Sequence, residues 1–407
     1  MNGGRLAVVF VIFVGCAIAW AILGRSVSRR TDQANTSLRG QVEGLWGQPL
    51  TQVAPRFSLI HEETVGQGKK RHTQQVTEPL TPDGSTLNAD LRLDLRRKGL
   101  LWYRCYNVSF GGSYLVANPS DRPMTCRASV ELPEANGTYS DLVFSLNGKR
   151  AVPVGQTATI TASVALQPHQ KGKLRFDYKT RGLETWTYKF GEGVANVKNL
   201  DLTVTTDFAR VNFPPNTISP TTKEDQGGGM KLVWRFGNLL SGAAAGVEMP
   251  EKLNPGPIAS RISFFAPVGL LFFIAVLVII GVMQDRNLHP MHYFFTAAAF
   301  FAFHLLFAYL VDHVAVAPSF AISALVSVAL VASYARLFTG WAFALRRIAV
   351  AQTLYLVLFS ATFFWPGYTG LAITVGAILT LFVMMQATGR LDWDAADRTP
   401  AAAPRPA

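Results

Sequence analysis

Two apolar stretches separated by a long polar segment decide what this chain can fold into. Residues 5–24 are RLAVVFVIFVGCAIAWAILG, and residues 262–388 are almost continuously apolar. A membrane span needs about 20 consecutive apolar residues. Only 16% of the chain is charged, against about 25% in a soluble domain. The sequence predicts a membrane protein with an N-terminal span over 1–24, an extracytoplasmic domain over 25–261 and a bundle of five spans over 262–388.

The links between the spans orient them. Breaks at polar residues, Pro and Gly predict spans at 262–283, 291–311, 318–336, 348–365 and 368–388. The links on one side contain Arg286, Arg336, Arg346 and Arg347, whereas DHVAVAPS and WPGYTG on the other side contain no Lys or Arg. Cytoplasmic links are enriched in Lys and Arg, so we expect both termini in the cytoplasm. Arg25, Arg29 and Arg30, on the outer side, run against this pattern.

The two ends of the chain need separate interpretations. The first apolar run is also compatible with a secretory signal, but it is longer than the usual signal core of about 7–15 residues, so we expect a retained anchor. Residues 389–407 end in ADRTPAAAPRPA. Because this Ala- and Pro-rich segment has no core to bury, we expect a disordered cytoplasmic tail.

The segment between the apolar stretches predicts strands. Alternating apolar and polar residues occur at 157–166, 173–180, 185–191, 200–208 and 230–237, with turn residues between them. The exception is TDQANTSLRGQVEGLW at 31–46, which predicts an outward extension of the first helix. The expected fold class is therefore an α+β membrane protein whose outer domain is a β-sandwich or a stack of β-layers.

The charge of the chain indicates its partners. The formal net charge is +12, and most of the basic excess lies in 25–261. A basic domain outside the membrane suits anionic lipids, acidic envelope polymers or other envelope proteins, although it is also compatible with a plain solvated surface. We find no nucleic-acid-binding motif. The expected partners are the lipid bilayer and envelope components, with no nucleic acid.

The chain has three cysteines, one in the first span and two in the outer domain. Cys16 lies in the apolar run, where a small apolar side chain fits. Cys105 and Cys126 fall on predicted strands that are adjacent in the sequence. An oxidising compartment permits a disulfide between them, but the sequence does not show whether their Cα atoms come within about 7 Å. The bridge stays open at this point.

Histidines and one aspartate are the candidate functional or packing residues of the membrane block. His289 and His292 are three positions apart, which suits two metal ligands, but a site needs further ligands and Asp285 is the nearest. Pro290 favours a simpler interpretation, a helix start. His304 is an ionisable group inside a span, where it is expected to bond to a neighbouring helix or to serve a proton pathway. Asp312 and His313 are positioned to pair with each other at the outer interface.

Motifs for catalysis are missing from the sequence. It contains no G-x-S-x-G, no H-E-x-x-H and no phosphate-binding G-x-x-x-x-G-K. We therefore expect neither enzymatic activity nor a bound cofactor or metal. A protein that supports or senses the envelope fits best, and a transporter or permease component that uses His304 is the alternative.

Four stretches resemble one bacterial family. They are SRRTDQ…GLWGQPLTQVAPRFSL (28–59), LRRKGLLWYRCYNVSFGGSY (95–114), LHPMHYFF (288–295) and GRLDWD (389–394). The chain is similar in these stretches to the CreD family of inner-membrane proteins, which is linked to cell-envelope integrity and colicin tolerance. The resemblance implies a location in the bacterial inner membrane and a non-enzymatic role in the envelope. It supplies no catalytic or ligand-binding residue.

Overall fold

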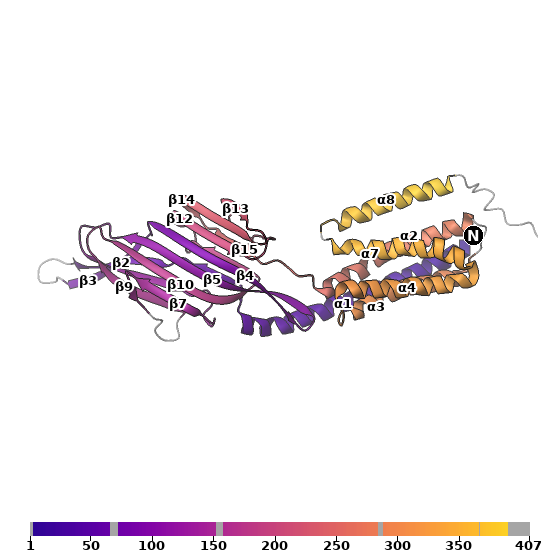
Figure 1. The fold of residues 1–407 in the computed structure, drawn as a ribbon, viewed down its shortest axis with the longest axis horizontal. Coiled ribbons are helices and arrows are strands. Elements are labelled where there is room, and N and C mark those ends of the chain that lie inside the picture. Colours follow the sequence, from indigo (N-terminus) through magenta and orange to yellow (C-terminus); the bar gives the residue numbers. More distant parts are fainter. Residues whose placement is uncertain (1–2, 66–71, 152–157, 284–287, 366, 390–407) are drawn as a thin grey trace, which may run out of the picture. The chain divides into compact units, whose positions relative to one another are not determined.

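The computed structural model describes residues 3–65, 72–151, 158–283, 288–365 and 367–389. The chain forms two compact units. The helical unit comprises the residues up to Thr36 and those from Leu253 onward, and the β-unit comprises Ser37–Lys252. The protein is thus α+β, with an apolar N-terminal helix, a sheet-rich middle and C-terminal helices (Figure 1). Of the predicted tail, only Gly389 lies within the described residues.

The first helix, α1, spans Gly3–Trp46. The predicted extension over 31–46 is confirmed, because the helix continues without interruption to Trp46. It ends at Gly47, whose φ of 87° lies in the left-handed region, a backbone conformation that glycine adopts with little strain. Because Thr36 ends the first part of the helical unit, α1 has residues in both units.

Fifteen strands are described in the β-unit, and they include all five predicted from alternation. The predicted strands correspond to β9, β10, β11, β12 and β14. The strands are β1 Leu50–Val53, β2 Arg56–Val65, β3 His72–Leu80, β4 Gly84–Lys98, β5 Leu101–Ala117, β6 Met124–Glu131, β7 Ser140–Leu146, β8 Lys149–Arg150, β9 Thr159–Leu166, β10 Lys171–Leu183, β11 Thr185–Lys189, β12 Ala195–Thr206, β13 Thr222–Asp225, β14 Met230–Ser241 and β15 Ala244–Glu248.

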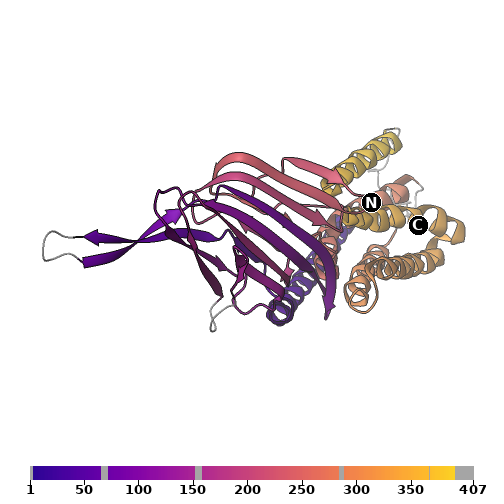
Figure 2. The same ribbon diagram turned by 60° about the vertical axis from the view of Figure 1, so that its left-hand side comes forward.

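These strands form three sheets. Their orders are β1-β11-β15, β13-β14-β12-β4-β5-β10-β7-β8 and β3-β2-β6-β9. In the largest sheet, β4 and β5 pair antiparallel from Gly84↔Leu115 to Lys98↔Leu101, and β10 pairs with the other edge of β5. The long strands of this sheet curve together, and the β2–β3 hairpin extends away from them (Figure 2). Along most of β5, every second side chain is buried, as alternation requires.

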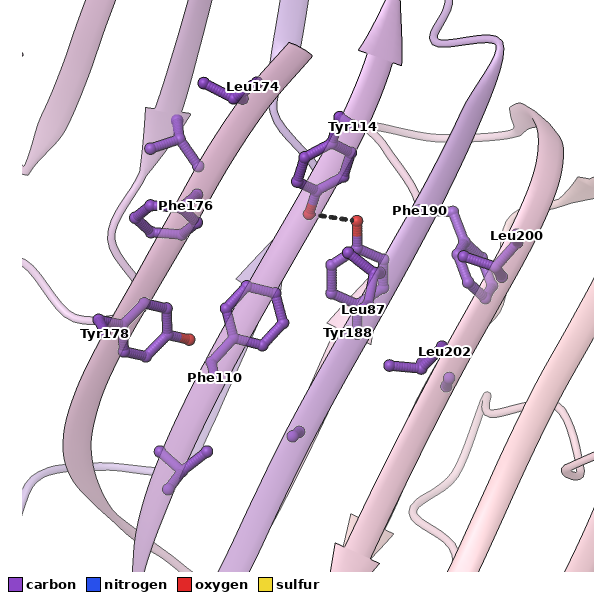
Figure 3. Packing of buried hydrophobic residues seen from close by; sticks show 14 of the residues in the cluster. Leu87, Phe110, Tyr114, Leu174, Phe176, Tyr178, Tyr188, Phe190, Leu200 and Leu202 are labelled. Carbon is purple, nitrogen blue, oxygen red and sulfur yellow. Dashed lines mark hydrogen bonds between the residues drawn. The ribbon is translucent and has the colours of Figure 1, made fainter. Parts of the chain in front are cut away.

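An aromatic core joins the three sheets, since all of them contribute side chains to it. At its centre the Phe110 ring stacks on Tyr178 and Tyr188, with centroids 5.2 and 6.2 Å apart. The hydroxyl oxygens of Tyr114 and Tyr188 lie 2.9 Å apart (Figure 3). Such aromatic pairs add about 0.5–1.5 kcal/mol each beyond their buried area. The core thus connects β5 and β10 of the large sheet to β11 of the three-stranded sheet.

Six described helices are long and apolar enough to cross a membrane. Besides α1, they are α2 Pro255–Met283, α3 Pro290–Leu310, α4 Val316–Thr339, the fifth helix Trp341–Phe364 and α8 Thr369–Thr388. Each corresponds to a predicted apolar run. α8 has the smallest buried share of the six, and Thr380 is its only buried residue.

The fifth helix is irregular in a way that hydropathy does not predict. Two π-helical stretches interrupt its α-helical turns, and the last turn is a 3₁₀-helix. The segments are α5 Trp341–Phe343, η2 Ala344–Ala349, α6 Val350–Gln352, η3 Thr353–Leu358, α7 Phe359–Ala361 and η4 Thr362–Phe364. π-Helical turns are rare in proteins as a whole, and those that do occur often lie at functional sites.

Candidate functional site in the helical unit

Asp312, just after α3, forms an ion pair with Arg30 of α1. Arg30 Nη2 lies 2.8 Å from Asp312 Oδ2 and donates a hydrogen bond of 3.1 Å to Ala308 O. The guanidinium carbon lies 5.4 Å from the ring centroid of Tyr309. Burial raises the pKa of the Asp312 carboxyl, although the charges of Arg30 and His313 act in the opposite direction. One arginine of α1 thus contacts a carboxylate, a carbonyl and an aromatic ring at the end of α3.

The sequence suggests that Asp312 pairs with its neighbour His313, and the structure corrects this. Arg30 of α1 reaches the carboxylate, while the His313 side chain is exposed. The backbone N–H of His313 bonds to Leu310 O in the turn that ends α3. Residues so far apart in the chain leave no local spacing pattern when they make contact. The sequence therefore did not reveal Arg30 as the partner of Asp312.

His304 lies in the core of the helical unit, among aromatic rings. Its ring centroid is 5.3 Å from that of Trp20 on α1 and 4.9 Å from that of Phe303, both edge-on. Its Nδ1 lies 3.1 Å from Phe300 O. A carbonyl oxygen can only accept, so Nδ1 carries the proton and Nε2 of the neutral ring is an acceptor. The predicted bond to a neighbouring helix is therefore corrected, because His304 bonds within α3.

Trp20 and His304 have complementary polar atoms. Trp20 Nε1 and His304 Nε2 are buried and have no hydrogen-bond partner among the described residues. The indole N–H can only donate, whereas Nε2 accepts. An unpaired buried polar group costs about 1–3 kcal/mol. Their rings are edge-on with centroids 5.3 Å apart, so one buried donor and one buried acceptor lie where α1 packs against α3.

His289 begins α3. Its Nδ1 accepts a hydrogen bond of 3.3 Å from the backbone N–H of Met291, and Pro290 is the first residue of the helix. The predicted helix start is therefore confirmed. A proline suits this position because the first helical N–H has no intrahelical partner.

His292 contacts α4 instead of sharing a ligand with His289. Its Nδ1 lies 2.9 Å from Tyr334 Oη, and its ring stacks on Phe338 at 4.0 Å. Within the described parts of the chain, no three His, Cys, Asp or Glu side chains are grouped as metal ligands. Asp285, the further ligand that the sequence offers, lies outside those parts.

A buried polar chain connects α3, α4 and the fifth helix. Gln352 Nε2 donates to Ser327 Oγ at 2.8 Å, and Ser327 Oγ donates to Ala299 O at 2.7 Å. Gln352 Oε1 is buried and finds no partner in the described residues. Sequence reasoning missed this chain. Its signal is the four-residue repeat of Ser319, Ser323 and Ser327, which places all three hydroxyls on the buried side of α4.

Within the β-unit, the last turns of α1 are held by charged and aromatic contacts. Arg39 Nη2 lies 2.9 Å from Glu184 Oε2, and this hydrogen bond is the largest cause that raises the pKa of Arg39. The guanidinium carbons of Arg96 and Arg181 lie 4.4 and 4.9 Å from the ring centroid of Trp46. Cation–π contacts at exposed sites contribute about 0.5–1 kcal/mol each. The end of α1 is therefore fixed to β4 and β10.

Cys105 and Cys126 are free thiols, both buried. Cys105 lies on β5, which pairs with β4 and β10, whereas Cys126 lies on β6, which pairs with β2 and β9. The two strands are consecutive in the sequence but belong to different sheets, and the structure contains no bridge between the two thiols. Burial raises the pKa of each thiol to about 11, which keeps both protonated and unreactive at neutral pH.

The helices and their apolar surfaces define a multi-pass membrane protein with a sheet-rich unit between its first two membrane helices. Comparison with known families agrees. Residues 238–394 match the model of the family described as inner membrane protein CreD. This match confirms the resemblance drawn from the sequence over 288–295 and 389–394, and the other two stretches, 28–59 and 95–114, lie outside the matched segment. The matched segment begins in β14 and includes all helices from α2 to α8. No curated protein sequence matches the chain.

Two solved structures that match the chain are similar to it at a low level. A protein of Legionella pneumophila subsp. pneumophila, provisionally described as nutrient binding, is 10% identical with a TM-score of 0.34, over 83% of this chain and 98% of its own. An M1 zinc metallopeptidase from Deinococcus radiodurans is 17% identical with a TM-score of 0.24, over 42% of this chain and 43% of its own. Neither score supports a conclusion about fold or function.

Proposed function

We propose that this protein is an inner-membrane protein of the CreD type that supports or senses the integrity of the bacterial cell envelope through its β-unit, without catalysing a reaction. The match over residues 238–394 supports the membrane part of the proposal. The observation that supports a role for the β-unit is that α1 has residues in both units. This one helix packs against α3 at Trp20 and is held within the β-unit at Trp46. A change in the β-unit that moves Trp46 would therefore act on a helix of the membrane core.

The proposed topology places the β-unit outside the cytoplasm and both termini inside it. Its support is the arginine pattern of the links, to which Arg25, Arg29 and Arg30 are the exceptions. Because Asp312 neutralises Arg30, this arginine adds no net charge to the outer side. We further propose that the partners are the bilayer, anionic lipids or acidic envelope polymers, and other envelope proteins, and that nucleic acid is not among them.

The test is made in cells that carry the gene on the chromosome. Deletion should change the sensitivity to detergent, to colicins and to envelope stress. The variant Trp46→Ala, which removes the ring between Arg96 and Arg181, should reproduce the deletion phenotype at normal protein abundance. Trp365→Ala, which removes a tryptophan that is 63% exposed, is the matched control and should behave as wild type. Unchanged sensitivities in the deletion strain would refute the envelope role.

Transport by the helical unit is the second candidate function. It is favoured by His304 Nε2 and Gln352 Oε1, two buried polar atoms without a partner in the described part of the chain. The aromatic enclosure of His304 and its bond to its own helix support packing more directly. His304→Ala should abolish uptake or export of a solute if transport is correct. A variant with wild-type growth and wild-type stability would contradict transport.

A further inference from the structure

Three exposed arginines lie at one end of the helical unit. They are Arg25 and Arg29 of α1 and Arg261 of α2. In the described residues, no carboxylate oxygen lies within 4.0 Å of these three side chains, in contrast to Arg30 with its partner Asp312. The nearest acid along α1, Asp32, accepts a hydrogen bond from Ser28. This end of the unit thus has a surplus of positive charge that the protein itself does not neutralise.

Two contacts fix how α1 and α2 pair at this end. Ser260 Oγ donates a hydrogen bond of 3.0 Å to Gly24 O. Farther along α1, Thr31 lies directly against Gly256, which precedes Ser260 on α2. As residue numbers rise on α1 they fall on α2, so the two helices are antiparallel. Gly24 and Ser260 lie at the same level of the pair.

The geometry of an antiparallel pair brings Arg25 and Arg261 to one side. Each follows a contact residue, Gly24 or Ser260, and one step along a helix turns the side chain by about 100°. Because the helices run in opposite directions, these two rotations carry Arg25 and Arg261 to the same side of the helix pair. Burial agrees, since Phe264 on this side is 43% exposed and Ala259 on the opposite side is fully buried.

On the N-terminal side of Arg25 and Arg29, α1 has a stripe of exposed apolar residues. Val11, Val14, Ile18 and Ile22 are 67%, 38%, 57% and 64% exposed. Arg25 and Arg29 continue the same spacing of three and four residues, so all six side chains lie on one face of α1. The face changes from hydrocarbon to positive charge within one turn, between Ile22 and Arg25. A molecule that covers it needs an anionic head and an apolar tail.

We propose that Arg25, Arg29 and Arg261 bind the phosphate of an anionic phospholipid whose acyl chain lies along Ile18 and Ile22. This inference rests on the proposed membrane location of the helices. A guanidinium group binds phosphate oxygens through two parallel hydrogen bonds, and the exposed Phe264 ring lies beside the arginines as part of the apolar surface. Each arginine at a membrane surface strengthens binding to anionic lipid about fivefold.

The experiment uses the full chain in nanodiscs made from phosphatidylcholine with a minor fraction of phosphatidylglycerol. A photo-crosslinking phenylalanine derivative replaces Ile22, and mass spectrometry identifies the lipids that it captures. The matched control carries the same group at Leu371, which is 63% exposed and lies near the start of α8. We expect phosphatidylglycerol to be enriched several-fold over its bulk fraction at Ile22 and not at Leu371.

A triple variant, Arg25→Gln with Arg29→Gln and Arg261→Gln, should remove the enrichment at Ile22. Removing three exposed charges of the β-unit, Arg127→Gln with Lys171→Gln and Lys173→Gln, should leave it unchanged. Equal lipid ratios at Ile22 and Leu371, or enrichment that survives the triple variant, would overturn the proposed site. Binding of a soluble polyanion that depends on the three arginines, without lipid enrichment, would assign them to an acidic polymer instead. Capture of no lipid at either position would refute the membrane location itself.

Discussion

Trp20 and His304 raise the question of how two polar nitrogens are accommodated in an apolar core. Each lacks a protein partner among the described residues, and together they form one donor and one acceptor. The edge-on geometry of their rings, with centroids 5.3 Å apart, brings α1 and α3 into contact at this point. The contribution of each nitrogen to stability should therefore depend on the presence of the other.

A double-mutant cycle tests this coupling. If Trp20 Nε1 donates a hydrogen bond to His304 Nε2 in the folded protein, His304→Phe and Trp20→Phe each leave one nitrogen without its complement, and each should lower the free energy of unfolding by about 1–3 kcal/mol. The double variant should lose less than the sum of the two, because no unpaired nitrogen remains. Unfolding in detergent micelles, followed by circular dichroism, gives the three values. Additive losses would show that the two nitrogens are independent.

The buried tyrosines of the β-unit predict lability in alkali. Burial raises the pKa of Tyr114 well above its ordinary value near 10, and it likewise raises the pKa of Tyr188. Above about pH 10 the unfolded chain releases these protons while the folded chain retains them, so the free energy of unfolding falls as pH rises. Each such tyrosine contributes about 1.4 kcal/mol per pH unit.

Tyr114→Phe isolates one of these contributions. Urea unfolding at several values from about pH 8 to about pH 11 should give parallel curves below about pH 10 and, above it, a shallower decline for this variant than for wild type, by about 1.4 kcal/mol per unit. Tyr368→Phe is the control, because Tyr368 is 69% exposed. Parallel declines for wild type and Tyr114→Phe would contradict the assigned pKa of Tyr114.

At the scale of helices and strands, local pattern predicts much of the structure. Apolar runs locate the helices, and alternation locates strands such as β12, because one face of each element is buried or lies in lipid. Pattern does not reveal which strands share a sheet: Cys105 and Cys126 lie on consecutive strands, β5 and β6, that belong to different sheets. It also does not reveal the partner of Asp312, which depends on how α1 packs against α3.

The π-helical stretch η3 lies in close contact with α2 at a glycine, and hydropathy does not record this contact. A Cβ at Gly269 of α2 would lie 2.5 Å from the backbone oxygen of Tyr355 in η3. Small residues allow such close approach between membrane helices. The backbone oxygen cannot move aside as a flexible side chain can, so any side chain at position 269 forces α2 and η3 apart.

Gly269→Ala should therefore lower the free energy of unfolding by about 1–3 kcal/mol, the usual cost of overpacking. Gly15→Ala, where nothing lies within 4 Å of the added methyl group, makes the same chemical change in an open position. Thermal unfolding in detergent compares the two variants. Equal midpoints for both would show that α2 and η3 are not in this close contact.

At the scale of the whole molecule, the proposed topology makes a prediction for intact cells. Single cysteines at Ser140 and Ala401, in a background without Cys16, Cys105 and Cys126, are exposed to a membrane-impermeant thiol reagent. Ser140 is exposed on β7 and should be labelled, whereas Ala401 should be labelled only after the cells are broken. The reverse pattern would place the β-unit in the cytoplasm and remove the basis for an envelope role.

The pairing of α1 with α2 determines how easily the β-unit can be exchanged in evolution. Thr31 lies against Gly256, so the chain leaves the helical unit after Thr36 and re-enters it at Leu253 near the same place. A unit whose two ends are neighbours can be inserted into a host, or exchanged for another, without breaking the host fold. The β-unit can thus be exchanged as one piece between two antiparallel helices, and its surface is free to diverge while α1 and α2 keep their contacts.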